Sequence, residues 1–126
     1  MTATRIFLLI QAVTFTAFGI YSFLNPTASM NLLGAPSMST MGLYEMRGIY
    51  GGVSVGAALL FWAGFFKKDM ERPALYFLLA YMGGYVLARV AALPLDGIPT
   101  GKMPFFLAFE TVSFVIAAAL SRRNNV

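Results

Sequence analysis

The sequence predicts an all-α membrane protein, a single domain (residues 1–126) in which four transmembrane helices form one bundle. Hydrophobic residues make up 59% of the chain and charged residues only 11%, whereas about a quarter of the residues of a soluble domain are charged. A helix needs about 20 apolar residues to cross the hydrocarbon core. Four apolar stretches approach or exceed that length, and they leave room for turns but not for a soluble domain. They are residues 5–24, 41–66, 74–93 and 104–120.

The first apolar stretch follows an arginine, as the core of a signal peptide does. It exceeds the usual length of such a core, and no small-x-small cleavage site follows it, so we expect a retained transmembrane helix over residues 5–24. Asn25 and Pro26 then suit the N-cap and first position of a new helix, and Gly34 suits its C-terminal end. A helix over residues 26–33 is too short to span, so we expect it to lie at the membrane interface.

Charged and turn-forming residues separate the other spans. Residues 67–73 (KKDMERP) predict a tight charged turn between the second and third spans. Pro94 is expected to close the third span, because proline lacks the N–H that a helix interior requires. Residues 96–101 (DGIPTG) predict a turn-rich loop, and Pro104 suits the first turn of the fourth span.

The distribution of Lys and Arg predicts the orientation of the spans, because cytoplasmic loops carry an excess of these residues. Six of them near span ends fall on one side, and only Lys102 falls on the other. We therefore predict a multi-pass protein of the bacterial inner membrane with both termini in the cytoplasm. The six are Arg5, Lys67, Lys68, Arg72, Arg122 and Arg123.

Charged residues inside the spans form the candidate functional site. Arg47 lies near the predicted outer end of the second span. Arg89 lies seven residues before Asp96 and Glu110 six residues after Pro104, so both are roughly 9–10 Å below the outer boundary at 1.5 Å per residue. A charge in hydrocarbon costs about 2.5–3.5 kcal/mol on insertion scales, so these groups must pair or line a wet cavity. We expect the Glu110 carboxylate to pair with Arg47, Arg89 or both.

Polar neighbours extend this predicted site. Tyr50 shares a helix face with Arg47, and Tyr85 shares one with Arg89, so each is expected to supply a hydroxyl. Glu45 is two residues from Arg47 and points about 200° away from it, so we expect it at the rim of the site or in contact with a different neighbour. The charges fit either a purely architectural network or a binding or catalytic pocket. The predicted ligand-binding residues are Arg47, Arg89, Glu110, Tyr50, Tyr85, Glu45 and Asp96.

The composition narrows the chemistry that this site can perform. The chain has no cysteine and no histidine, which excludes disulfides, thiolate nucleophiles, imidazole catalysis and the usual zinc or haem ligation. We expect no metal and no cofactor. The net charge of +4 comes without a basic stripe interleaved with aromatic residues, so we expect no nucleic-acid partner.

Small residues recur every four positions in the second and third spans. Such ridges let membrane helices approach closely, so we predict that these two spans pack against each other. The ridges are Gly48, Gly52 and Gly56 in one span, and Ala80, Gly84, Ala88 and Ala92 in the other.

The string EMRGIYGG at residues 45–52, then Arg89, DGIP at residues 96–99 and Glu110, resembles a family of small four-helix bacterial membrane proteins of unknown function. The resemblance covers nearly the whole chain, and that family is distantly similar to the DoxX-like membrane proteins. It implies the four-span fold and no established reaction. Because DoxX-like proteins include accessory subunits of membrane oxidoreductases, it implies a partner-protein role by analogy. The residues that match the family pattern are Arg47, Tyr50, Gly51, Gly52, Arg89, Asp96, Gly97, Pro99 and Glu110.

Three classes of function fit these observations. The favoured one is an accessory or binding protein, surrounded by membrane lipids, that holds a lipid-like small molecule or docks another membrane protein. The alternative is a small enzyme that isomerises an apolar substrate or moves a proton on it, with Glu110 as acid or base. A carboxylate between two arginines suits a stabilised anion better than a base, which weighs against catalysis. Transport is least favoured, because no inverted repeat and no broken helix is recognisable.

Overall fold

The computed structural model describes residues 2–34 and 39–123, and every regular element in them is a helix. Four helical stretches there, Ala3–Leu24, Thr40–Phe66, Lys68–Asp96 and Met103–Arg123, are long and apolar enough to cross a membrane. The predicted all-α class and its four candidate spans are therefore confirmed, while the orientation stays a prediction. The elements are α1 (Ala3–Leu24), α2 (Pro26–Leu32), α3 (Thr40–Met46), the π-helix η1 (Arg47–Val53), α4 (Ser54–Phe66), the 3₁₀-helix η2 (Lys68–Met70), α5 (Glu71–Asp96) and α6 (Met103–Arg123).

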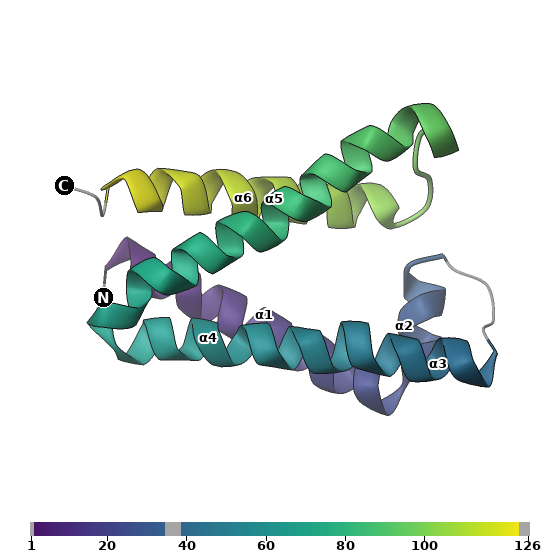
Figure 1. The fold of residues 1–126 in the computed structure, drawn as a ribbon, viewed down its shortest axis with the longest axis horizontal. Coiled ribbons are helices and arrows are strands. Elements are labelled where there is room, and N and C mark those ends of the chain that lie inside the picture. Colours follow the sequence, from purple (N-terminus) through teal and green to yellow (C-terminus); the bar gives the residue numbers. More distant parts are fainter. Residues whose placement is uncertain (1, 35–38, 124–126) are drawn as a thin grey trace. The chain divides into compact units, whose positions relative to one another are not determined.

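The contacts divide the chain into two compact units, Met1–Glu71 and Arg72–Val126. In the first unit, α1 lies antiparallel to the continuous helix formed by α3, η1 and α4 (Figure 1). Phe15 of α1 packs edge-on against Phe61 of α4, with ring centroids 5.2 Å apart. The buried residues of α1 recur every three or four positions, which is the pattern of one helix face turned to a partner. They include Leu8, Ala12, Phe15, Gly19 and Ser22.

Asn25 builds the turn between α1 and α2, as the sequence predicts. Its backbone N–H donates to the Tyr21 carbonyl at 2.8 Å, and its side-chain oxygen accepts from the N–H of Ala28 at 3.2 Å. A buried pair of hydroxyls, Ser22 and Ser29, 2.8 Å apart, then ties α2 to α1. The predicted short helix is confirmed, and its place at the membrane interface stays a prediction.

Two glycines bring the backbones of α1 and η1 together. A Cβ added to Gly19 would lie 2.8 Å from Val55 Cγ2 and 3.0 Å from the Gly51 carbonyl oxygen. A Cβ added to Gly51 would lie 2.9 Å from Phe23 Cβ and 3.2 Å from its Cα. Backbone atoms cannot swing away as a flexible side chain can, so glycine at these two positions permits the close approach of the helices.

The close contact with α1 involves Gly51 of the π-helix η1, which is not a member of the predicted ridge of Gly48, Gly52 and Gly56. A π-helix bonds residue i to i+5, so it rotates everything that follows relative to an α-helical register. Among the described residues, a Cβ on Gly48 or Gly56 would meet nothing within 4 Å, and one on Gly52 only a carbonyl of its own helix at 4.0 Å. Packing of the second span on the third through this ridge stays a prediction.

The third span is longer than predicted at its start. The 3₁₀-helix η2 takes up Lys68–Met70, and α5 already begins at Glu71. The prediction of a charged turn over residues 67–73 was therefore too long. Helical φ and ψ angles suit Pro73 here, because the first N–H groups of a helix need no partner within it.

Pro94 does not end the third span, and that prediction was wrong. The helix α5 continues through Pro94 to Asp96. Because Pro94 lies in the last turn, its missing N–H removes one hydrogen bond at the frayed end of the helix and none from the interior. Gly97 ends the helix instead, with a left-handed φ of +84° and its N–H bonded to the Leu93 carbonyl at 3.0 Å.

In the second unit, α6 follows a short loop after α5 and begins at Met103, with Pro104 in its first turn as predicted. Side chains bridge the two helices. The ring of Phe114 lies against Gly83, where an added Cβ would be 3.1 Å from Phe114 Cε1. The buried residues of α6 follow one face of the helix and are Glu110, Ser113, Ala117, Leu120 and Ser121.

Candidate functional site

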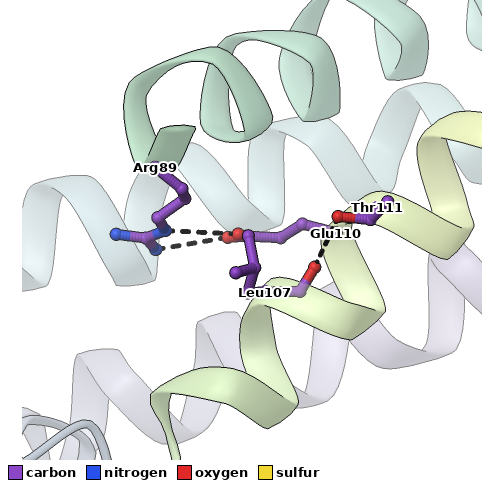
Figure 2. A network of polar contacts seen from close by, with 4 residues as sticks. All are labelled: Arg89, Leu107, Glu110 and Thr111. Carbon is purple, nitrogen blue, oxygen red and sulfur yellow. Dashed lines mark hydrogen bonds and ion pairs between the residues drawn. The ribbon is translucent and has the colours of Figure 1, made fainter. Parts of the chain in front are cut away.

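Arg89 of α5 and Glu110 of α6 form a bidentate ion pair (Figure 2). Arg89 Nε donates to Glu110 Oε1 and Arg89 Nη2 to Glu110 Oε2, each at 3.3 Å. The planar guanidinium matches the two carboxylate oxygens, which fixes both side chains. The side chain of Glu110 is 10% exposed and that of Arg89 is 31% exposed. The predicted pairing of Glu110 with Arg89 is confirmed, and the pair keeps part of its cationic side accessible.

An aromatic ring supports the arginine of this pair. The guanidinium carbon of Arg89 lies 5.3 Å from the ring centroid of Tyr85, one turn earlier on α5. Tyr81 and Phe77 continue the same face, with centroids 5.2 Å and 5.6 Å apart along the series. We had expected a hydroxyl from Tyr85, and the structure shows a ring contact with Arg89. A cation over a ring is stabilised by the quadrupole of the ring, so Tyr85 helps to position Arg89.

The hydroxyl of Thr111, the residue after Glu110, bonds within its own helix. Thr111 Oγ1 donates to the Leu107 carbonyl at 2.9 Å (Figure 2), a common local bond for threonine in a helix. Among the described residues, no three His, Cys, Asp or Glu side chains gather as they would around a metal ion. This part of the second unit offers a ligand three kinds of group, which are guanidinium donors, one buried carboxylate and tyrosine rings.

Arg47 belongs to the first unit and contacts the end of α1. Its Nη1 donates to the Phe23 carbonyl at 2.9 Å, and its guanidinium carbon lies 5.7 Å from the centroid of the Phe23 ring. The last four carbonyls of a helix have no partner within it and carry the negative end of its dipole. Arg47 therefore caps α1, and its predicted meeting with Glu110 stays a prediction.

We expect Arg47→Met to destabilise the first unit by about 1 kcal/mol, because the Phe23 carbonyl loses a charged donor at an exposed site. Denaturant titration in detergent, followed by circular dichroism, measures the change. Glu45→Gln is the matched control, since Glu45 is an exposed residue of the same helix. A midpoint for Arg47→Met equal to that of the parent would show that the cap contributes nothing.

The other predicted site residues lie apart from these contacts. Tyr50 is half-buried in η1, and its ring meets Phe18 edge-on at a centroid distance of 5.8 Å. Glu45 is exposed, and Asp96 is the exposed last residue of α5. A ligand-binding role for any of the three stays a prediction.

Arg5 has a role that sequence reasoning missed. Its Nε donates to the Phe65 carbonyl at 3.0 Å across 60 residues, and its guanidinium carbon lies 5.0 Å from the Phe65 ring centroid. Phe65 lies in the last turn of α4, so Arg5 caps α4 as Arg47 caps α1. The sequence shows only that Arg5 is a cation near a span end. Its partner, the Phe65 carbonyl, depends on the antiparallel pairing of α1 with α4.

Comparison with known protein families finds a match over residues 3–121, to a domain of unknown function (DUF4345). The match takes in all four candidate spans and the positions of Arg47, Arg89 and Glu110. No curated protein and no solved structure matches the chain. The expected family of unknown function is supported, whereas the match itself includes no link to DoxX-like proteins. The chain is a multi-helix membrane protein that belongs to this DUF4345 family.

Proposed function

We propose that this chain is a membrane-embedded binding protein whose Arg89–Glu110 pair holds a lipid-like small molecule. The ion pair carries the proposal, because ionisable groups within apolar spans are costly and usually mark a site of function. The Glu110 side chain is almost buried while the Arg89 side chain is 31% exposed, so the arginine is the more accessible member of the pair for a ligand. Glu110 holds the guanidinium in place, which lowers the entropy that a ligand must overcome.

The ligand that suits these groups is amphipathic. Its polar head would accept hydrogen bonds from Arg89, as carboxylates and phosphates do from arginine. Its apolar part would lie along the same membrane-facing side of α5, where Leu93, one turn beyond Arg89, is 41% exposed. On the opposite side of Arg89 along the helix, one turn earlier, the Tyr85 ring contacts the guanidinium. This arrangement favours an anionic or oxygen-bearing head on an apolar body.

The geometry favours binding over the alternative of an enzyme in which Glu110 moves a proton. Both carboxylate oxygens of Glu110 already accept hydrogen bonds from Arg89, so neither oxygen is left without a donor. A general base needs an oxygen within reach of the substrate proton. Docking of a partner membrane protein, as for an accessory subunit of the inner membrane, rests on the DoxX-like resemblance alone. It therefore enters as an outcome of the test.

Native mass spectrometry of the protein, extracted gently from its own membrane, tests the proposal. We expect a discrete small-molecule mass on the parent and its loss from the double variant R89L/E110L. That variant removes both charges together and so strands neither in the membrane. Lys102→Gln, which removes an exposed cation from the loop before α6, is the control and keeps the added mass.

Three results would contradict small-molecule binding at the pair. The added mass persists in the folded R89L/E110L variant, the added mass is that of a protein, or the parent is bare. The second of these results would favour the accessory role, and circular dichroism confirms that each variant is folded.

A further inference from the structure

We propose that the end of the first unit formed by Arg5, Lys67 and Lys68 is a binding site for the headgroup of an acidic phospholipid. These cations lie where α1 begins and α4 ends, as the bond from Arg5 to the Phe65 carbonyl shows. The proposal concerns a different part of the chain from the Arg89–Glu110 pair and does not depend on the proposed function.

An aromatic cluster marks the membrane boundary at this end. Trp62 and Phe66 stack at a centroid distance of 5.9 Å, and Phe65 meets Phe66 edge-on at 5.0 Å. The Trp62 indole N–H donates to Thr16 Oγ1 at 3.0 Å, so the ring is fixed against α1. Phe66 is 70% exposed, and Lys67 follows it directly. Aromatic rings concentrate where the hydrocarbon meets the headgroups, and lysines just beyond them lie at the level of the phosphates.

Arg5 is held in a position to bind a phosphate. Within the described residues its guanidinium donates through Nε alone, to the Phe65 carbonyl, and lies over the Phe65 ring. Nη1 and Nη2 are thus available to a further acceptor, and paired N–H groups of arginine match phosphate oxygens. The ring contact and the bond fix the guanidinium before any lipid arrives, so little side-chain entropy remains to be lost.

The two lysines add charge at the same end. Lys67 leaves the helix in an extended conformation with its N–H bonded to the Ala63 carbonyl at 2.8 Å, and Lys68 opens η2. Both side chains are exposed. Each lysine near an anionic surface contributes to attraction of acidic lipid. A guanidinium and two ammonium groups at a membrane boundary therefore complement a phosphodiester with an uncompensated charge.

Two carboxylates lie in the same turn and do not cancel this attraction. Asp69 is in η2 and Glu71 begins α5, so both are at the positive end of a helix dipole. Backbone N–H groups of a first helical turn partly balance such side chains. Three cations therefore lie near two carboxylates whose negative charge is partly balanced by backbone N–H groups. The remaining positive charge favours an anionic headgroup over a zwitterionic one.

Lipid titration of the delipidated protein in neutral detergent tests the proposal, with bound lipid counted by native mass spectrometry. We expect phosphatidylglycerol to be retained at concentrations at which phosphatidylcholine is not. The double variant K67Q/K68Q is expected to weaken retention of phosphatidylglycerol by about thirtyfold, the scale set by two lysines at a membrane surface. Both lysines are exposed, so the helices remain folded, and circular dichroism verifies this.

The double variant R122Q/R123Q is the matched control. It removes two cations from the end of α6, which the sequence places on the same side of the membrane, and leaves Arg5, Lys67 and Lys68 in place. Retention in this control is expected to stay within about twofold of the parent, because the three cations of the proposed site are unchanged. Equal losses in the two double variants, or no loss in K67Q/K68Q, would overturn the proposal. Competition by soluble glycerol phosphate at equal strength would identify a general anion site and overturn it as well.

Discussion

Glu110→Leu is expected to destabilise the second unit by about 3 kcal/mol, because Arg89 then remains charged inside a membrane span without its partner. This value is the lower end of the cost of removing one partner of a buried ion pair, because the Arg89 side chain is 31% exposed. Denaturant titration in detergent measures the change.

The double variant R89L/E110L separates architecture from function. It removes both charges and is expected to unfold close to the midpoint of the parent, because replacing a whole ion pair by apolar residues is often neutral. Glu45→Leu, at an exposed position, serves as the control for a lost carboxylate. A double variant as unstable as Glu110→Leu would show that the pair is needed to hold α5 and α6 together, and that its role is architectural.

Gly51→Ala is expected to destabilise the first unit by about 1–3 kcal/mol, the usual cost of overpacking. The new methyl carbon would lie 2.9 Å from Phe23 Cβ and 3.2 Å from Phe23 Cα, so α1 must move away from η1. Unfolding of the purified variant in detergent measures the loss. The bond from Arg47 to the Phe23 carbonyl lies at the same contact and is expected to lengthen as α1 moves.

Gly56→Ala is the control for this substitution. A Cβ there meets nothing within 4 Å among the described residues, and alanine favours a helix over glycine by up to about 1 kcal/mol. We expect Gly56→Ala to be neutral or slightly stabilising. A cost equal to that of Gly51→Ala would mean that the ridge of Gly48, Gly52 and Gly56 packs closely against another helix, as the sequence predicts.

The pairing of Arg89 with Glu110 could be predicted from the sequence because both residues are predicted to lie at the same depth. Depth follows from counting residues from a span end at a constant rise, which needs no knowledge of the partner helix. The turn at Asn25 could also be predicted from the sequence, because an N-cap depends on the residues directly around it. The four spans themselves follow from composition and length alone.

Contacts between helices needed the tertiary structure. The segment Arg47–Val53 has no composition that distinguishes a π-helix from an α-helix, and it carries Gly51, which lies closely against Phe23 of α1. Arg5 and Arg47 gained their roles only because antiparallel helices bring each next to the final carbonyls of the other helix.

By itself, the sequence determined the four candidate spans and the turn at Asn25, because length, capping and hydrophobicity act locally. The tertiary structure decided which face of α1 meets η1, and so gave Gly51 its close contact with Phe23 and Arg47 its partner, the Phe23 carbonyl. Rotation of a helix about its axis depends on side chains packed from distant parts of the chain, and one π-helical turn changes it.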